Sequence, residues 1–131
     1  MKTQQREIKF RVFNHEVGEM RDWQYVQDHY SLNLFENNPK YTDIITVMQY
    51  TGLKDKKGVE IYDGDIVKMY NNHLAVIKWS VWLRGIGFFA DIYKYSEEMI
   101  VDTADLKNFE RELGRSEIIG NIYENPELLN L

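Results

Sequence analysis

Short runs of alternating hydrophobic and polar residues recur along this chain, and Gly, Asn or Asp residues separate them. Residues 8–12 alternate apolar with basic side chains, which is the period of a strand with one buried face and one solvated face. Residues 44–50 are rich in β-branched side chains, and residues 74–83 place apolar side chains at every odd position. This pattern predicts a mainly β protein. Further strands are expected at residues 65–70, 88–95 and 118–123.

Tight turns are expected between these strands. Residues 54–58 form a predicted hairpin turn in which the closing Gly58 suits a positive φ, and Asp63-Gly64 supplies a second turn. Residues 84–87 are expected to turn the next pair of strands. Short strands joined by tight turns are typical of a small barrel or sandwich. We therefore expect one domain over residues 1–131, with an SH3-like or related β-barrel or sandwich built from hairpins.

Little helix is expected, and it falls near the C-terminus. Residues 106–113 place three apolar side chains at the three- and four-residue spacing of a helix. A last helical turn is expected at residues 126–129, because Pro126 suits the first helical position. In the N-terminal half, residues 20–26 are expected to resume an extended segment, and residues 27–42 to form a long loop.

Length and composition narrow the class of protein. The chain has 131 residues and a mass of 15.7 kDa, which suits one domain around a single core. It contains no cysteine, so disulfides and thiolate metal sites are excluded. No apolar run approaches the ~18 residues that a membrane span needs, and the N-terminus has no apolar signal core. We expect a cytoplasmic protein that does not bind membranes.

The net charge of −5 is unevenly distributed. Residues 1–21 carry five basic and three acidic side chains, a net charge of +2. Residues 97–131 carry three basic and nine acidic side chains, a net charge of −6. Because acidic surfaces repel phosphates, this charge disfavours a sequence-independent grip on nucleic acid unless the basic residues cluster in space.

No pattern of catalytic or metal-binding residues stands out. Asp63-Gly64-Asp65 begins like a calcium loop, but Val67 and Lys68 occupy the next ligand position and the glycine position, so a turn is the simpler interpretation. The three histidines lack the spacing of a helical metal site, and Gly85-Ile86-Gly87 precedes no helix. We therefore expect no enzymatic activity, no cofactor and no metal. An enzyme would need a cleft that unites Asp63, Asp65 and a histidine.

One face of the predicted sheet is a candidate interaction surface. If residues 74–83 pair with residues 88–95, four aromatic side chains share a face with Lys78 and Asp91, while the odd positions, Trp79 among them, face the core. Three explanations compete for the aromatic face: a second layer of this chain covers it, an identical subunit covers it, or it is a ligand platform. The side chains assigned to this surface are Lys78, Trp82, Phe89, Tyr93 and Tyr95.

Three segments of the chain form a recognisable set. Residues 49–53 read Gln-Tyr-Thr-Gly-Leu, a Lys-Asp turn follows at residues 54–55, and Gly64-Asp65 precedes an apolar strand. Together with the two ends, at residues 6–11 and 118–129, they resemble the YopX family of phage and prophage proteins. The resemblance implies a mostly β fold with a barrel-like core, homo-oligomers and no known activity. Its structural signatures fall on Gly52, Gly58, Gly64, Asp65, Gly120, Asn121 and Pro126.

Two functional hypotheses from different classes remain. The first is a non-enzymatic phage or prophage accessory protein that assembles with itself and binds a host or phage protein through its aromatic or acidic surface. The second is a nucleic-acid-binding barrel in which aromatic side chains stack on bases and basic side chains touch phosphates. The acidic last third of the chain favours the first. The basic residues assigned to the second are Arg6, Lys9, Arg11, Lys54, Lys56 and Lys57.

Overall fold

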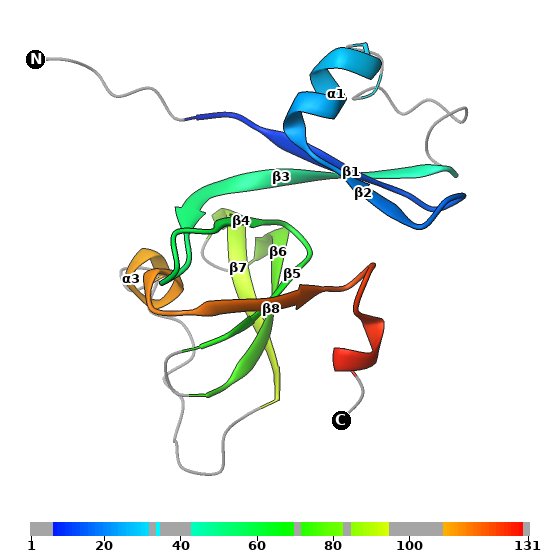
Figure 1. The fold of residues 1–131 in the computed structure, drawn as a ribbon. Coiled ribbons are helices and arrows are strands. Elements are labelled where there is room, and N and C mark those ends of the chain that lie inside the picture. Colours follow the sequence, from blue (N-terminus) through cyan, green and yellow to red (C-terminus); the bar gives the residue numbers. More distant parts are fainter. Residues whose placement is uncertain are drawn as a thin grey trace, which may run out of the picture.

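The computed structural model describes residues 7–31, 34, 43–69, 72–82, 85–94 and 109–129. Its strands are β1 (Phe10–Asn14), β2 (Glu19–Arg21), β3 (Ile45–Lys54), β4 (Glu60–Tyr62), β5 (Asp65–Lys68), β6 (Leu74–Trp82), β7 (Gly85–Lys94) and β8 (Glu117–Asn121). Its helices are α1 (Trp23–His29), α3 (Phe109–Gly114) and the 3-10 helix η3 (Pro126–Leu129). The strands form two antiparallel sheets, in the orders β2-β1-β3-β4 and β7-β6-β5-β8 (Figure 1). The prediction of a mainly β fold is confirmed.

The first sheet is built around β3, the long strand that pairs with β1 on one side and β4 on the other. The register of β3 against β4 shifts between Tyr50 and Lys54, where Gly52 has a φ of +88°. An extra residue at such a bulge bends the strand and increases its twist. The predicted hairpin turn between β3 and β4 is confirmed, with Gly58 at a φ of +80°.

The carboxylate of Asp55 holds this hairpin turn. Its Oδ1 accepts hydrogen bonds from the amides of Lys57 and Val59, both at 2.9 Å, and its Oδ2 accepts one from the amide of Ile118 on β8, at 3.1 Å. Burial alone would raise the pKa of Asp55, but the three amide hydrogen bonds outweigh it and leave the pKa below its usual value. One buried carboxylate thus joins the β3–β4 turn to the second sheet.

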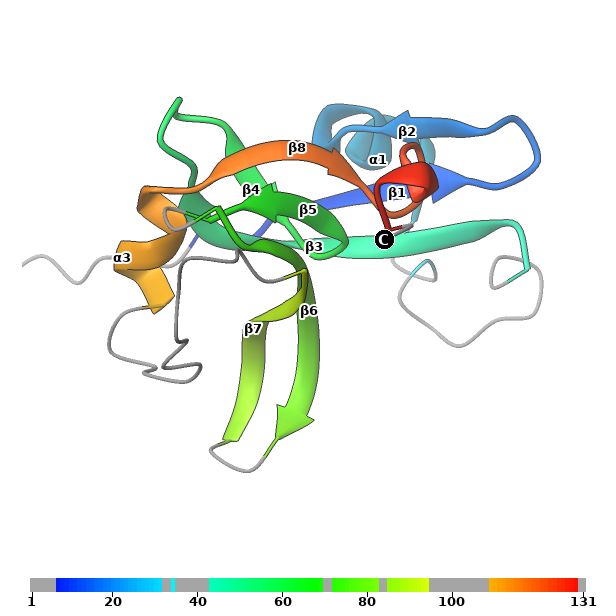
Figure 2. The same ribbon diagram turned by 90° about the horizontal axis from the view of Figure 1, so that it is seen from below.

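The second sheet is curled into a half-barrel. β5 lies in its middle, paired with β6 on one side and β8 on the other, and β6 continues into a long antiparallel pairing with β7. Figure 2 shows the β6–β7 hairpin running across the direction of β8 and extending away from the other labelled elements. The outer part of this hairpin therefore has few neighbours among the described elements.

Two clusters of buried hydrophobic side chains form the core. The larger lies between the second sheet, β4 and α3, and includes Ile61, Val67, Ile77 and Leu113, all of them 0% exposed. The smaller lies between α1 and the first sheet and is centred on Val12, also 0% exposed. Each cluster belongs mainly to one sheet, so the contacts between the sheets are partly polar.

Residues 20–26 do not form one extended segment, and that prediction is wrong. β2 ends at Arg21 and α1 begins at Trp23. The side chain of Asp22 accepts a hydrogen bond from the amide of Tyr25 at 2.9 Å, which caps the helix. Val26 then packs into the smaller core. The long loop was predicted to begin at residue 27, but α1 extends to His29, and residues 32–33 and 35–42 lie outside the described part of the chain.

The remaining predictions near the C-terminus have mixed outcomes. α3 buries Leu113 as predicted, although residues 106–108 lie outside the described residues. The last turn is present but is a 3-10 helix. The turn predicted at residues 84–87 is wrong in its position, because Gly85 and Gly87 already pair with β6, opposite Trp82 and Ser80.

Candidate functional site

Four of the predicted signature residues lie together where the two sheets meet. Asp65 opens β5 and pairs with Asn121 at the end of β8, while Gly120 lies opposite Ile66. Gly64 comes between the sheets, and its carbonyl accepts a hydrogen bond from the amide of Ile122. These residues therefore form a structural junction rather than a chemical site.

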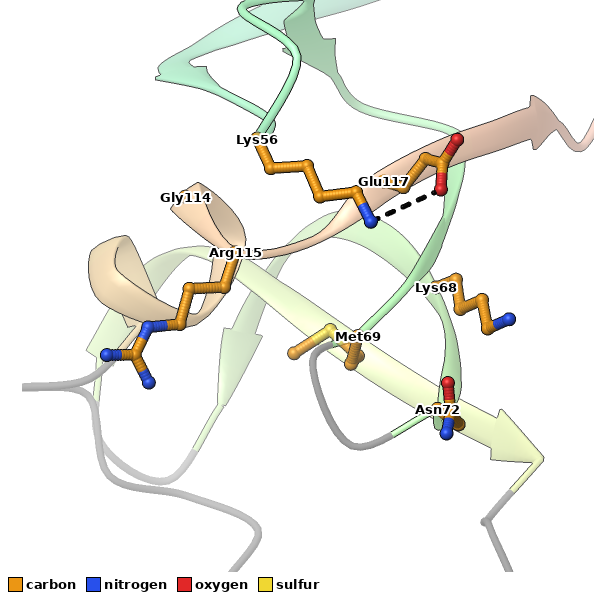
Figure 3. A pocket seen from close by; sticks show the side chains of 7 residues that line it. All are labelled: Lys56, Lys68, Met69, Asn72, Gly114, Arg115 and Glu117. Atoms are coloured by element: carbon orange, nitrogen blue, oxygen red, sulfur yellow. Dashed lines mark ion pairs between the residues drawn. The ribbon is translucent and has the colours of Figure 1, made fainter.

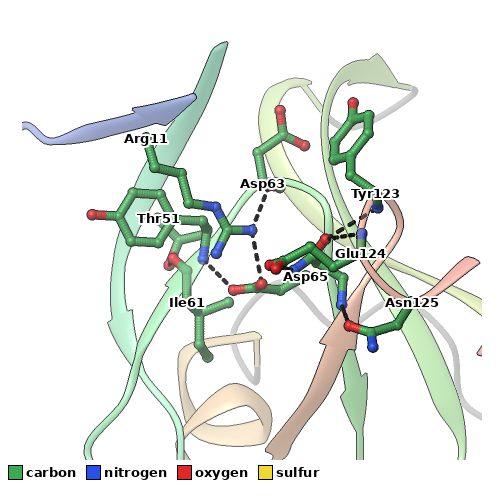
Figure 4. Close-up of polar contacts among 10 residues, drawn as sticks. Arg11, Thr51, Ile61, Asp63, Asp65, Tyr123, Glu124 and Asn125 are labelled. Atoms are coloured by element: carbon green, nitrogen blue, oxygen red, sulfur yellow. Dashed lines mark hydrogen bonds and ion pairs between the residues drawn. The ribbon is translucent and has the colours of Figure 1, made fainter. Parts of the chain in front are cut away.

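Arg11 reaches this junction from β1. Its Nη2 lies 2.8 Å from Asp65 Oδ1, and it also donates to the carbonyl oxygen of Asp63 at 3.4 Å (Figure 4). The guanidinium carbon lies 4.7 Å from the centre of the Tyr62 ring. The side chains of Arg11 and Asp65 are only 14% and 2% exposed. Arg11 is thus a mostly buried side chain held in the junction, a position that does not favour its predicted role as a nucleic-acid contact.

The carboxyl groups at the junction lie in a poorly solvated place. Burial raises the pKa of Asp65, against the opposing effect of Arg11, and burial also raises the pKa of Asp63. His15 lies nearby on the surface of the first sheet, where its Nε2 is 2.7 Å from Thr46 Oγ1 and its ring contacts Tyr123. Among the described residues, no group of three His, Asp or Glu side chains could hold a metal ion.

The close approach of β8 to the C-terminal turn explains why Gly120 and Asn121 occupy their positions. Asn121 Oδ1 accepts hydrogen bonds from the amides of Tyr123 and Glu124, at 3.1 and 2.8 Å. Asn125 Oδ1 in turn accepts one from the amide of Asn121, at 3.1 Å. A Cβ on Gly120 would lie 2.6 Å from that Asn125 oxygen, so only glycine fits. Pro126 follows as the first residue of η3.

The predicted interaction surface on β6 and β7 is only partly formed as expected. Lys78 lies opposite Phe89, and its Nζ makes a 2.6 Å ion pair with Asp91, so these three side chains share one face. The hydroxyl of Tyr93 donates to the carbonyl of Leu128 at 2.9 Å, and η3 therefore covers part of this face. Tyr95 and the side chain of Trp82 lie outside the described part of the chain.

Trp79 is not in the core, contrary to the sequence prediction. It is 47% exposed, although Ala75 and Ile77 on the same face of β6 are fully buried. β6 extends away from the other described elements (Figure 2), so the outer half of its inner face has little to pack against among them. Trp79 instead packs edge-on against Phe88, with ring centres 4.7 Å apart. The outer hairpin thus exposes a large aromatic side chain.

Within the part of the chain that the structure describes, the basic residues assigned to nucleic acid are divided among several ion pairs. Hydrogen bonds to Glu60 and Glu7 raise the pKa of Lys9 and engage its charge in the first sheet. Lys56 and Lys57 lie in the turn between β3 and β4. They share the carboxylate of Glu117, at 3.5 and 2.6 Å. Lys54 is exposed, and Arg6 lies outside the described residues.

A pocket of about 470 Å³ opens beside Lys56 (Figure 3). The sequence analysis assigned Lys56 as a basic contact but missed the other polar residues that line the pocket. Lys68 could have been recognised as an exposed basic residue, because it is the charged end of an otherwise apolar strand. Nothing in the sequence around Arg115, which follows α3, indicated that it would line a pocket. The lining residues are Lys56, Lys68, Met69, Asn72, Gly114, Arg115 and Glu117.

Fold and junction define a β-rich protein with two antiparallel sheets, one of them a half-barrel, held together by buried polar contacts. The chain matches the model of the YopX protein family over residues 9–130 and belongs to that family. It is also similar to the crystal structure of protein EF1440 from Enterococcus faecalis, with 22% identity and a TM-score of 0.58, over 96% of this chain and 100% of that one. That likeness shows the fold.

A comparison with curated proteins found no match. In the described residues, none of the helices has the length and apolar character needed to cross a membrane.

Proposed function

We propose that this YopX-family protein is a non-enzymatic interaction module that assembles with itself through the outer edge of β7. The observation that carries the proposal is the position of β7, which pairs with β6 on one side and ends the order β7-β6-β5-β8 among the described strands. An open strand edge presents unpaired N–H and C=O groups that another strand can satisfy.

The composition of β7 supports this proposal. The strand is ten residues long and reads Gly-Ile-Gly-Phe-Phe-Ala-Asp-Ile-Tyr-Lys. It contains no proline, and its one acidic side chain, Asp91, is neutralised by Lys78 on the neighbouring strand. Protected edges usually carry proline, inward charges or a bulge that prevents pairing. The one register shift of β7 against β6 lies near its end, between Ile92 and Lys94. The longer part of the edge before it, without proline, is suited to pairing with a second copy of itself.

The exposed aromatic side chain next to this edge adds a hydrophobic contribution. Trp79, 47% exposed, packs against the buried ring of Phe88 on β7 and presents its own apolar surface beside the β7 edge. Two hairpins joined edge to edge by a two-fold axis would place two such surfaces side by side and remove Trp79 from water. Aromatic side chains of this kind supply much of the binding energy in protein interfaces.

The same β7 edge could also bind a partner protein. An extended segment of a host or phage protein could pair with the β7 edge in place of a second copy, since strand addition needs only backbone groups and a few side-chain contacts. We place the protein in the cytoplasm of a bacterial host carrying a phage or prophage, as the family resemblance implies. The acidic net charge of −5 suits a protein partner better than a polyanion.

The nucleic-acid hypothesis has weaker support. Arg11 is buried in the junction and Lys9 is paired with two carboxylates, which leaves Lys54, Lys56 and Lys57 from the predicted set in the described residues. The aromatic residues Phe89 and Tyr93 are on β7, while these lysines flank the β3–β4 turn.

Sedimentation velocity over a series of protein concentrations tests self-association. We expect the wild-type chain to associate and Trp79→Lys to weaken association about tenfold or more, because the charge must be buried at the interface. Val17→Lys is the matched control: Val17 is a similarly exposed apolar residue, at 57%, in the turn between β1 and β2. A monomeric wild type, or equal effects of the two variants, would contradict the proposal.

A further inference from the structure

The outer edge of β8 is occupied by side chains of the same chain. β8 ends the second sheet opposite β7 and pairs with β5 on its inner side, so its amides that donate elsewhere face the outer edge. The amide of Ile118 donates to Asp55 Oδ2, and the amide of Asn121 donates to Asn125 Oδ1, both at 3.1 Å. These two side-chain oxygens take the place of the carbonyls that a further strand would offer.

The backbone of β8 closes the same edge further. Its register against β5 shifts, because Gly120 lies opposite Ile66 while Ile118 lies opposite Val67, which leaves Ile119 as an extra residue. A bulge of this kind interrupts the regular spacing of the outward amides and twists the edge away from a flat partner strand. The β8 edge is therefore irregular between its two capped amides.

The outer strands of the first sheet are protected as well. β2 and β4 have three residues each, and very short edge strands resist the addition of a partner. The amide of Asp63 donates to the carbonyl of Gln49 on β3, so the amide of Tyr62 points away from β3, where Asp65 Oδ2 accepts it at 2.7 Å. Of the four outer strands that the structure describes, β7 is the longest, with ten residues.

We propose that Asp55 and Asn125 are edge caps that make self-association stop at two copies. The inference rests on the proposed pairing through β7. A sheet with two open edges can add copies in an open chain, whereas a sheet with one open edge closes when the same edges of two copies meet about a two-fold axis. With β8 capped, the β7 edge of one copy pairs with the β7 edge of a second copy in antiparallel orientation.

Pairing of β7 with β8 of another copy is disfavoured because it requires the caps to be displaced. Asp55 is 6% exposed, and its carboxylate would lose the amide of Ile118 without gaining water in exchange. Asn125 lies directly against the β8 backbone, since a Cβ on Gly120 would come within 2.6 Å of its Oδ1. A strand added to β8 would have to move this side chain first.

Sedimentation velocity of the full-length chain at increasing concentration tests the inference. We expect the wild-type mass to rise and then level off at about twice the chain mass of 15.7 kDa. Asn125→Ala removes the acceptor of the Asn121 amide, so it should form species larger than two copies, and hydrogen exchange at that amide should become about tenfold faster. Asn125→Asp keeps an acceptor oxygen and should level off at two copies like the wild type.

Asn14→Ala is the matched control, because Asn14 Oδ1 accepts from the amides of Glu16 and Val17 in a turn and not at the edge of the second sheet. Growth of the wild type beyond two copies would overturn the inference and leave self-association intact, whereas a monomeric wild type would overturn both. An Asn125→Ala variant that stops at two copies would overturn the role of the caps, as would equal growth of Asn14→Ala or Asn125→Asp. Slow hydrogen exchange in β3 shows that each variant is folded.

Discussion

The guanidinium of Arg11 lies 2.8 Å from the carboxylate of Asp65, and this contact joins β1 of the first sheet to β5 of the second. The same carboxylate accepts a hydrogen bond from the amide of Tyr62 at 2.7 Å, so both of its oxygens have a partner. Polar groups buried this deeply must be paired, because an unpaired charge is costly away from water. Arg11 and Asp65 therefore fix how the two sheets meet.

Replacing Arg11 by Met should destabilise the protein strongly. The change leaves the Asp65 carboxylate, 2% exposed, without its cation. Removing one partner of a buried pair costs about 3–5 kcal/mol in the free energy of unfolding. Urea unfolding followed by circular dichroism measures it. Because burial raises the pKa of Asp65, the cost should shrink in acid as the carboxyl becomes protonated.

The exposed ion pair of Lys78 and Asp91 supplies the control for this prediction. Both side chains are 48% exposed, so Lys78→Met should change the free energy of unfolding by no more than about 1 kcal/mol. Similar losses in Lys78→Met and Arg11→Met would show that Arg11 and Asp65 do not hold the sheets together.

Gly120→Ala should destabilise the C-terminal turn. The added Cβ would lie 2.6 Å from Asn125 Oδ1, the oxygen that accepts the hydrogen bond from the Asn121 amide. Overpacking of this kind costs about 1–3 kcal/mol. Thermal unfolding measures the loss. Gly87→Ala is the matched strand variant, since its Cβ would meet nothing within 4 Å, and an equal effect there would refute the steric explanation.

Asp55→Asn should make the free energy of unfolding less dependent on pH in the acidic range. The folded state lowers the pKa of Asp55 below its ordinary value, so the ionised carboxylate stabilises the fold at neutral pH. Its contribution is lost as the pH falls through the lowered folded pKa. We expect the variant to be about 1–3 kcal/mol less stable at neutral pH, because an amide oxygen cannot replace both carboxylate oxygens.

Measuring the free energy of unfolding of Asp55→Asn and of the wild type, at neutral pH and near pH 2, checks the direction of this pH dependence. The difference between them should shrink in acid. Comparing the two chains removes the contributions of Asp63 and Asp65, whose raised pKa values act in the opposite direction in both. A difference that stays constant or grows in acid would contradict the role given to the carboxylate.

Local patterns in the sequence predicted the elements that local chemistry determines. Alternation identified β1 and β6, the Asp63-Gly64 turn marked the start of β5, and the turn at Gly58 was placed correctly. The helix α1 was missed, because its capping signal is the single residue Asp22 and the apolar residues around it also suit a strand. A short helix of seven residues is stabilised mainly by packing, which a local pattern does not contain.

The candidate sites were harder to predict because they depend on contacts between distant segments. Arg11 and Asp65 are far apart in the sequence, so nothing local showed that Arg11 would be buried. Trp79 has the spacing of a core residue, yet it is exposed because β6 extends away from the other described elements. The pocket combines Lys56, Lys68 and Arg115 from three segments. Only the folded arrangement could reveal these three features.

Cysteine scanning along β7 tests the central claim, self-association through this edge, most directly. The chain has no cysteine of its own, so each introduced thiol is unique. Residues facing each other across an antiparallel pair have Cα atoms about 4.5–5.5 Å apart, within reach of a disulfide. We predict that mild oxidation links two copies efficiently at one position among residues 87–93 and poorly at its neighbours. Uniformly low linkage at every position, equal to that of Glu16→Cys in the β1–β2 turn, would contradict self-association through β7.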